Sequence, residues 1–168
     1  MPKSQTPSPY LSSAVINNAV ALVTSVHDGR CNVMTASFFA ESSHVPVLVR
    51  VAIAPTTLTH EFISGSRFFG LSLLADNQGE LALACGTISG RDGSKFDRLE
   101  LRHRLSPNGI PLLPGCLTTS ECRVVEQHVL ADHTLFVGKI LLSFRQTALG
   151  LRQPLLVSHL TCGPRRSF

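Results

Sequence analysis

The feature that most constrains the fold is a tight turn between two apolar, β-branched runs. Val20–Val26 (VALVTSV) and Cys31–Ala40 (CNVMTASFFA) flank the tetrapeptide HDGR, whose centre is Asp28-Gly29. Asp and Gly tolerate the positive φ angles of a two-residue hairpin turn, so this segment predicts an antiparallel β-hairpin. A lone hairpin is only marginally stable in water, so more strands must pack with it.

Further runs of the same kind follow along the chain. Two amphipathic segments interrupt them and predict short helices, Thr56–Ser66, capped by Thr56 or Thr57, and Asn77–Cys85. Tyr10–Asn18 predicts a third short helix. About seven short strands with so few helices predict an antiparallel barrel or sandwich. The remaining predicted strands are Val45–Ala54, Phe68–Ala75, Cys116–Val129, Thr134–Arg145 and Pro154–Leu160.

Length and composition limit the domain count and the partners. The chain has 168 residues, which is typical of one domain. We expect a single domain over residues 10–162, between a disordered tail (1–9) and a C-terminal tail (163–168). The net charge is only +4, with one Tyr and no Trp, so the interleaved basic and aromatic residues of a nucleic-acid surface are missing. The apolar run Val45–Pro55 contains Arg50 and is too short to span a membrane.

Cysteine usage predicts the compartment. The five cysteines are an odd number and contain no C-x-x-C pair. No apolar stretch typical of a secretory signal follows the N-terminus. Free thiols in a reducing environment are the simplest interpretation, so we expect a cytoplasmic protein without nucleic-acid or membrane partners.

Several common catalytic motifs are missing from the sequence. It contains no G-x-x-x-x-G-K-[ST] phosphate loop and no G-x-S-x-G nucleophile turn. The glycines at positions 86, 90 and 93 do not have the spacing of a dinucleotide fingerprint. The seven His are scattered without metal-ligand spacing, so we expect no metal site.

Four short segments nevertheless occur in a fixed order: Asn32–Phe38 (NVMTASF), Val49–Ile63 (VRVAIAPTTLTHEFI), Ser89–Phe96 (SGRDGSKF) and Ala131–Gly138 (ADHTLFVG). Together they resemble the flavin reductase-like family, and the likeness runs over nearly the whole chain, about residues 15–160. The resemblance implies a mainly β fold, the FMN-binding split β-barrel, which is an antiparallel Greek-key barrel with a few short helices. It also implies a homodimer with FMN near the subunit interface.

The function that the resemblance implies is an NAD(P)H-dependent flavin reductase. Such an oxidoreductase takes hydride from NADH or NADPH onto flavin and passes electrons to free flavin or to a partner, such as a monooxygenase component. The alternative is a non-catalytic FMN-binding electron carrier of the flavoredoxin type. Because 168 residues leave little sequence for an adenine domain beside the barrel, we expect FMN rather than FAD.

The residues themselves suit a flat ring and a phosphate. Small residues in NVMTASF allow close approach of the backbone to a ring, and Thr35 and Ser37 add hydroxyls. In SGRDGSKF, Arg91 and Lys95 can bind a phosphate or simply pair with neighbouring aspartates. The threonines of PTTLT can cap a helix, contact a phosphate, or both. We expect the cofactor to be bound by Met34, Thr35, Ala36, Ser37, Ala52, Ile53, Ala54, Thr57, Thr59, Ser89, Arg91, Lys95 and Phe96.

One histidine completes the expected site. His133 matches the histidine of the family's G-D-H segment, although Ala131 stands where Gly is usual. The resemblance implies that it lies by the nicotinamide and the flavin. Hydride transfer needs no titrating group at the nicotinamide carbon, so we expect His133 to orient the nicotinamide. Two apolar runs, Val45–Ala54 and Phe68–Ala75, exceed what a small barrel buries, which also favours a homodimer.

Overall fold

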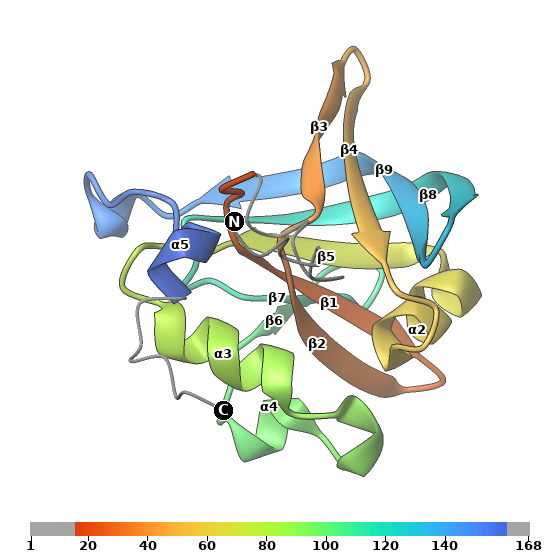
Figure 1. The fold of residues 1–168 in the computed structure, drawn as a ribbon, viewed down its shortest axis with the longest axis horizontal. Coiled ribbons are helices and arrows are strands. Elements are labelled where there is room, and N and C mark those ends of the chain that lie inside the picture. Colours follow the sequence, from red (N-terminus) through yellow and green to blue (C-terminus); the bar gives the residue numbers. More distant parts are fainter. Residues whose placement is uncertain (1–15, 161–168) are drawn as a thin grey trace, which may run out of the picture.

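The computed structural model describes residues 16–160, and Figure 1 shows how their strands and helices are arranged. Both predicted tails, Cys162 and most of the predicted helix Tyr10–Asn18 lie outside the described residues. Within them, antiparallel strands form the main sheet and the helices are short. The chain is therefore mainly β, as predicted.

The N-terminal hairpin has the predicted turn. β1 (Ala21–His27) and β2 (Arg30–Ala36) pair along their full length, with His27 opposite Arg30. Asp28 and Gly29 have φ angles of 47° and 72°, which are the positive values that a two-residue hairpin turn requires. The predicted turn and hairpin are confirmed.

Five more strands extend this hairpin into one seven-stranded sheet, in the order β2-β1-β5-β8-β9-β4-β3. Each neighbouring pair is antiparallel. A separate short ribbon is formed by β6 (Arg104–Leu105) and β7 (Pro111–Leu112). The five added strands are β3 (Phe39–His44), β4 (Val47–Ile53), β5 (Phe68–Leu73), β8 (Thr118–Leu130) and β9 (His133–Arg145).

A two-residue link closes the sheet into a barrel. β2 and β3 lie at opposite ends of the strand order, yet only Ser37 and Phe38 separate Ala36, the last residue of β2, from Phe39. Three residue steps span at most about 11 Å, so the two sheet edges meet at this link. The sheet is therefore a barrel that is split between β2 and β3, as predicted. The predicted single strand over Cys31–Ala40 is wrong, because the chain passes from one sheet edge to the other at this link.

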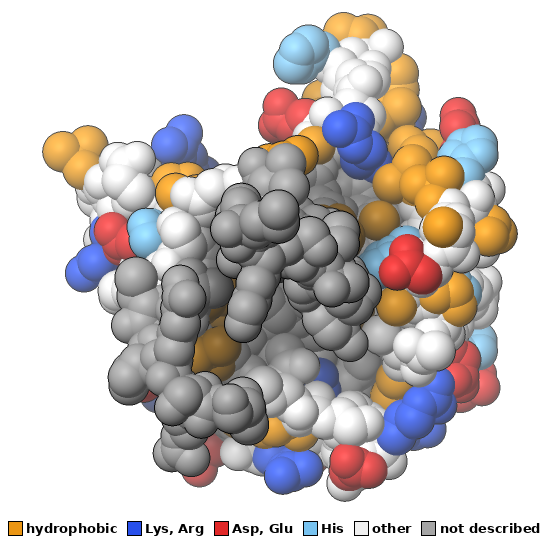
Figure 2. All heavy atoms as spheres, viewed as in Figure 1, with side chains coloured by type: hydrophobic (Ala, Val, Ile, Leu, Met, Phe, Trp, Pro, Cys, Tyr) orange, Lys and Arg blue, Asp and Glu red, His pale blue; other side chains and the backbone are white. Residues whose placement is uncertain are grey.

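The β3–β4 hairpin projects from the barrel at the top of Figure 1. Val45 and the cis proline Pro46 form its turn, and Val45 is 93% exposed. The predicted strand Val45–Ala54 therefore begins two residues later, at Val47. Figure 2 shows hydrophobic side chains at this tip.

Short helices pack beside β1 and β2. The predicted helices Thr56–Ser66 and Asn77–Cys85 are confirmed as α2 (Leu58–Ser66) and α3 (Gly79–Thr87). The SGRDGSKF segment and the residues directly after it contain the 3-10 helix η1 (Gly90–Asp92) and the one-turn helix α4 (Lys95–Arg98). None of the helices within residues 16–160 is long and apolar enough to cross a membrane.

The last predicted strand, Pro154–Leu160, is wrong. Pro154 and Leu156 make only isolated bridges, with Ala75 and Ala19. After the short helix η2 (Thr147–Leu149), the chain instead ends its described part in α5 (Val157–Leu160). The helical conformation places the side chains of Val157 and Leu160 together against the hydrophobic cluster beneath α3. In an extended strand these two side chains would point to opposite faces.

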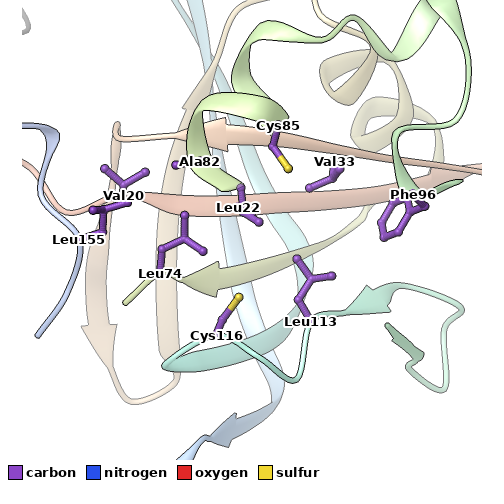
Figure 3. Close-up of a cluster of buried hydrophobic side chains, with 10 residues drawn as sticks. All are labelled: Val20, Leu22, Val33, Leu74, Ala82, Cys85, Phe96, Leu113, Cys116 and Leu155. Atoms are coloured by element: carbon purple, nitrogen blue, oxygen red, sulfur yellow. The ribbon is translucent and has the colours of Figure 1, made fainter. Parts of the chain in front are cut away.

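Two hydrophobic clusters lie on opposite faces of β1. Leu22 belongs to the cluster drawn in Figure 3, together with residues of α3 and α4, and the adjacent Val23 belongs to the barrel interior around Phe69 and Phe136. Successive residues of a strand point to opposite faces. This arrangement explains why the run Val20–Val26 is almost continuously apolar.

Buried thiols contribute to both clusters. Cys85 and Cys116 lie in the Leu22 cluster, and Cys122 lies in the barrel interior. Burial raises the pKa of Cys85 to about 11 and the pKa values of Cys116 and Cys122 to about 12. A thiol with a raised folded pKa stabilises the fold below its unfolded pKa of about 9, and this contribution is lost as the pH rises further.

We expect the free energy of unfolding to fall above about pH 9, by about 1.4 kcal/mol per pH unit for each such thiol. Cys122→Ala should be less stable at pH 8 because it leaves a cavity, but it should lose less stability than the wild type on going to about pH 11. Urea unfolding at each pH measures both slopes. The lowered pKa of Lys95 acts in the opposite direction and is common to both proteins. Equal slopes would contradict the prediction.

Candidate functional site

Two adjoining hollows lie at the split of the barrel. The split hollow, of about 180 Å³, lies between the ends of β2 and β4. The helix hollow, of about 350 Å³, lies between β2, the start of α2 and the segment that joins α3 to α4. Both are lined by Met34 and Thr35. The two hollows therefore adjoin along β2. They are together called the groove, and no Asp or Glu is among its described lining residues.

Backbone and small side chains shape the split hollow. Its walls are Met34–Phe38 on one side and Ala52–Ala54 on the other, and His133 lies at its edge. The hydroxyl of Thr35 donates to the carbonyl of Ala82 and holds α3 against β2. The hydroxyl of Ser37 is half-buried and makes no hydrogen bond to another described residue. A hollow lined by backbone and small side chains suits a flat ring.

The ring of His133 is held from two sides. Its Nδ1 lies 2.9 Å from a carboxylate oxygen of Asp132, and its ring centroid lies 5.5 Å from that of Phe38. Hydrogen bonding to His133 lowers the pKa of Asp132. Ala131 has a φ of 42°, so it adopts the left-handed conformation that the family's usual Gly favours. The substitution of Ala for Gly thus leaves the turn in place.

The threonines at the start of α2 have structural partners. The Thr57 hydroxyl caps α2 by accepting from the His60 amide at 3.2 Å, and it donates to the Ala54 carbonyl at 2.9 Å. Thr59 is buried, and its hydroxyl accepts from the side-chain amide of Asn32 at 2.8 Å. The backbone amides of Leu58 and Thr59 have no intrahelical partner. These amides are therefore donors available to a ligand at the start of α2.

Lys95 is a buried cation at the floor of the helix hollow. It is 4% exposed, and its Nζ donates to the carbonyls of Val33 and Cys85, each at 2.8 Å. No carboxylate of the described residues pairs with it. Burial lowers the pKa of Lys95. An ammonium has three donors, so one proton remains available, and an anion in the hollow would compensate the unpaired charge.

Arg91 lies at the open end of the same hollow. Its guanidinium is 3.1 Å from a carboxylate oxygen of Glu61, with both side chains about half exposed. The expectation that Arg91 and Lys95 might only pair with Asp92 or Asp97 is wrong, because neither pair forms. Since exposed ion pairs contribute little to stability, the Arg91 guanidinium can turn towards a ligand at small cost.

A family model described as "Flavin reductase like domain" matches residues 12–158 of the chain. The chain belongs to this family. The resemblance on the four short segments is confirmed.

Named relatives are of moderate similarity. The FMN reductase (NADH) SmoA of Agrobacterium fabrum is 32% identical over 108 residues, which is 64% of this chain and 59% of that protein. The reductase subunit HsaB of a flavin-dependent monooxygenase from Rhodococcus jostii is 28% identical over 72% of this chain and 60% of its own length. This chain thus spans less than two thirds of these relatives.

A solved structure supports the same fold. The FMN-binding protein of Thermus thermophilus superimposes with a TM-score of 0.76 at 28% identity, over 89% of this chain and 82% of that one. The split barrel of this flavin reductase-like domain is therefore also the fold of a protein described as FMN-binding.

The groove of this flavin reductase-like domain contains all but one of the residues predicted from the sequence. The exception is Phe96, which is 6% exposed and packs with Leu113 and Val33 in the cluster of Figure 3. Phe96 also lines a hollow beside η1 and α4, so its assignment to the cofactor site stays a prediction. The role of each remaining residue stays a prediction.

Sequence analysis missed some lining residues. Asn32 lines the helix hollow, as do the end of α3 and the residue after it, residues 86–88. Asn32 is a polar residue within the strand β2 and is only 3% exposed, and its place in the NVMTASF segment was the available signal. A separate, mainly apolar hollow of about 380 Å³ lies by the β6–β7 ribbon and shares no residue with the groove.

Gly90 allows the loop of the helix hollow to lie against Asn32. A Cβ at this position would collide with the Asn32 side-chain oxygen and would come within 3.1 Å of a Leu58 methyl. Asn32 is itself fixed by its hydrogen bond to Thr59. The close approach therefore positions η1, with Arg91, beside the start of α2.

We expect Gly90→Ala to destabilise the protein by about 1–3 kcal/mol, the range for overpacking a well-packed site, and to displace Arg91 from the groove. The matched control is Gly115→Ala, because an added Cβ there meets nothing within 4 Å. Thermal unfolding measures the loss of stability. A Gly90→Ala protein as stable as Gly115→Ala would show that the loop can move away at no cost.

Proposed function

We propose that this flavin reductase-like protein binds FMN in the groove and acts as an NADH- or NADPH-dependent flavin reductase. The observation that supports this most is that the two hollows of the groove adjoin, so that a split lined by backbone and small residues lies next to a hollow with a buried cation that no carboxylate of the described residues pairs. A ring at one end and a phosphate at the other match these two environments. The hollows of about 180 and 350 Å³ suit a ligand of small-molecule size.

The chain's own residues would bind and orient the ligands. Lys95, the side chain of Arg91 and the first amides of α2 would hold the phosphate, since a helix N-terminus favours an anion. The Met34–Phe38 and Ala52–Ala54 segments would hold the ring and exclude water from both of its faces. His133, fixed by Asp132 and Phe38, would orient the nicotinamide at the mouth of the split hollow.

The titratable groups of the groove agree with this chemistry. When bound, FMN supplies the acceptor for a hydride. A general acid or base is then unnecessary at the nicotinamide carbon. Of the remaining groups, the Cys85 thiol is buried and has its pKa raised to about 11, so it stays protonated at neutral pH.

We also propose a homodimer and an electron acceptor outside the chain. Val45 and Val129 are 93% and 79% exposed, at the tips of the β3–β4 and β8–β9 hairpins, where Figure 2 shows hydrophobic side chains. A second copy would cover such surface. Light scattering should give twice the chain mass of 18.1 kDa.

A relative named as the reductase subunit of a monooxygenase supports a monooxygenase partner as the electron acceptor.

The proposed function is tested on the purified protein with added FMN. We expect a visible flavin spectrum on the protein after gel filtration, and bleaching of that spectrum by NADH or NADPH without oxygen. Retained FMN that neither nucleotide bleaches would favour the electron carrier. Failure to retain or reduce any flavin would overturn the proposal.

Arg91→Ala should weaken FMN affinity roughly tenfold or more, because a charge-assisted hydrogen bond contributes about 1.5–3 kcal/mol. Arg152→Ala is the matched control, since Arg152 is also an exposed arginine 3.1 Å from one carboxylate, that of Asp76, and lines no part of the groove. Fluorescence titration with FMN measures both. Lys95→Ala is a less clear test, because it also leaves two buried carbonyls without a donor. Equal affinities in the two Arg variants would remove Arg91 from the site.

His133→Asn should raise the KM for NAD(P)H or slow flavin reduction several-fold, while bound FMN is retained. The physical reason is that Asn keeps a polar group but loses the ring that packs on Phe38. His128→Asn serves as control, because His128 likewise lies 2.9 Å from a carboxylate but outside the groove. Stopped-flow reduction at several NADH concentrations separates the two effects. Loss of FMN from the His133 variant would instead indicate a role in cofactor binding.

A further inference from the structure

A further hollow opens directly beside the helix hollow. It measures about 450 Å³ and lies between the β1–β2 turn and the η1–α4 segment. Gly90 and Arg91 line both hollows, so a ligand that passes Arg91 enters the second space without leaving the protein surface. Its lining residues include Arg30, Phe96, Asp97 and His103.

This turn hollow is predominantly basic. Arg30 and Arg91 contribute guanidinium groups to it, and Asp97 is the one carboxylate among its lining residues. Arg30 has no carboxylate within ion-pair distance in the described part of the chain. Instead it lies over the ring of Phe62, with 5.6 Å between the guanidinium carbon and the ring centroid. It is thus an ordered cation that remains available to an anion.

The opposite wall offers an aromatic surface and polar groups. The His103 ring packs edge-on against Phe96, with 4.8 Å between their centroids, and His103 is exposed. A hydrogen bond between Nδ1 and the Leu101 carbonyl fixes the imidazole. Aromatic side chains stack on nucleobases. Asp97 can accept hydrogen bonds from ribose hydroxyls, as carboxylates do in dinucleotide sites.

We propose that the turn hollow binds the adenosine 5′-phosphate part of a dinucleotide, with Arg30 on its phosphate. This inference rests on the proposed function, since the flavin half of FAD would occupy the groove in place of FMN, and the nicotinamide half of NADH would lie at the mouth of the groove beside His133. Two ligands carry this group, FAD and the nicotinamide dinucleotide. The chain length argued against a separate adenine domain, but a hollow built from one turn and two short helices needs no additional domain.

Arg30→Ala tests the inference, with Arg30→Lys as the conservative variant. Arg50→Ala is the matched control, because Arg50 is also exposed and without a carboxylate partner, but lies on β4 and lines none of the three hollows. For each protein, titration gives the Kd values for FMN and FAD, and steady-state assays with FMN give the KM for NADH. In Arg30→Ala we expect the Kd for FAD or the KM for NADH to rise about tenfold, while the Kd for FMN stays unchanged. Arg30→Lys should partly restore the raised value.

The outcomes distinguish FAD from the nicotinamide dinucleotide as the ligand of the turn hollow, and they distinguish failure of this inference from failure of the proposed function. Weakened FAD binding assigns the hollow to the flavin dinucleotide, and a raised KM for NADH alone assigns it to the nicotinamide dinucleotide. An Arg30→Ala protein with wild-type values for both, in a wild type that binds and reduces FMN, overturns this inference alone. A wild type that neither binds nor reduces FMN overturns the proposed function itself. If Arg30→Ala fails to fold, His103→Ala is measured in the same way against the same outcomes.

Discussion

The short link between β2 and β3 is the constraint on which the rest of the structure depends. Ser37 and Phe38 must connect strands at opposite ends of a seven-stranded order, so the sheet has to curl until its edges meet. A curled sheet gains an interior, where Phe69, Phe136 and their neighbours pack. It also leaves an opening at the edges that meet without pairing, and the split hollow lies there. Closure of the barrel and formation of the groove thus have the same cause.

Buried polar contacts then fix what surrounds this opening. Lys95 joins β2 to α3 through two carbonyls, and Asn32 joins β2 to α2 through Thr59. Each such hydrogen bond contributes about 1 kcal/mol, but leaving a buried partner unpaired costs more. The segments that line the helix hollow are therefore held by contacts to the barrel rather than by their own short helices. Rigid placement of this kind suits a site that orients ligands for hydride transfer.

Local signals were sufficient wherever the backbone conformation depends on neighbouring residues alone. The Asp28-Gly29 turn, the strands beside it and the capped helix α2 could all be predicted in this way. Predictions failed where a distant contact decides the outcome. Pro154–Leu160 has the apolar content of a strand, but it finds only two bridging partners and then coils against the cluster under α3.

The sequence by itself determined the strand and turn pattern, the family and the set of segments that line the groove, because each depends on the order of residues along the chain. Only the tertiary structure decided what each polar group does. Thr59 accepts a hydrogen bond from Asn32, Lys95 is a buried cation bonded to carbonyls, and Arg30 lines the turn hollow together with His103. These roles depend on which groups from distant segments come within hydrogen-bond or ring-contact distance. Such distances are set only when the sheet closes and the helices pack on it.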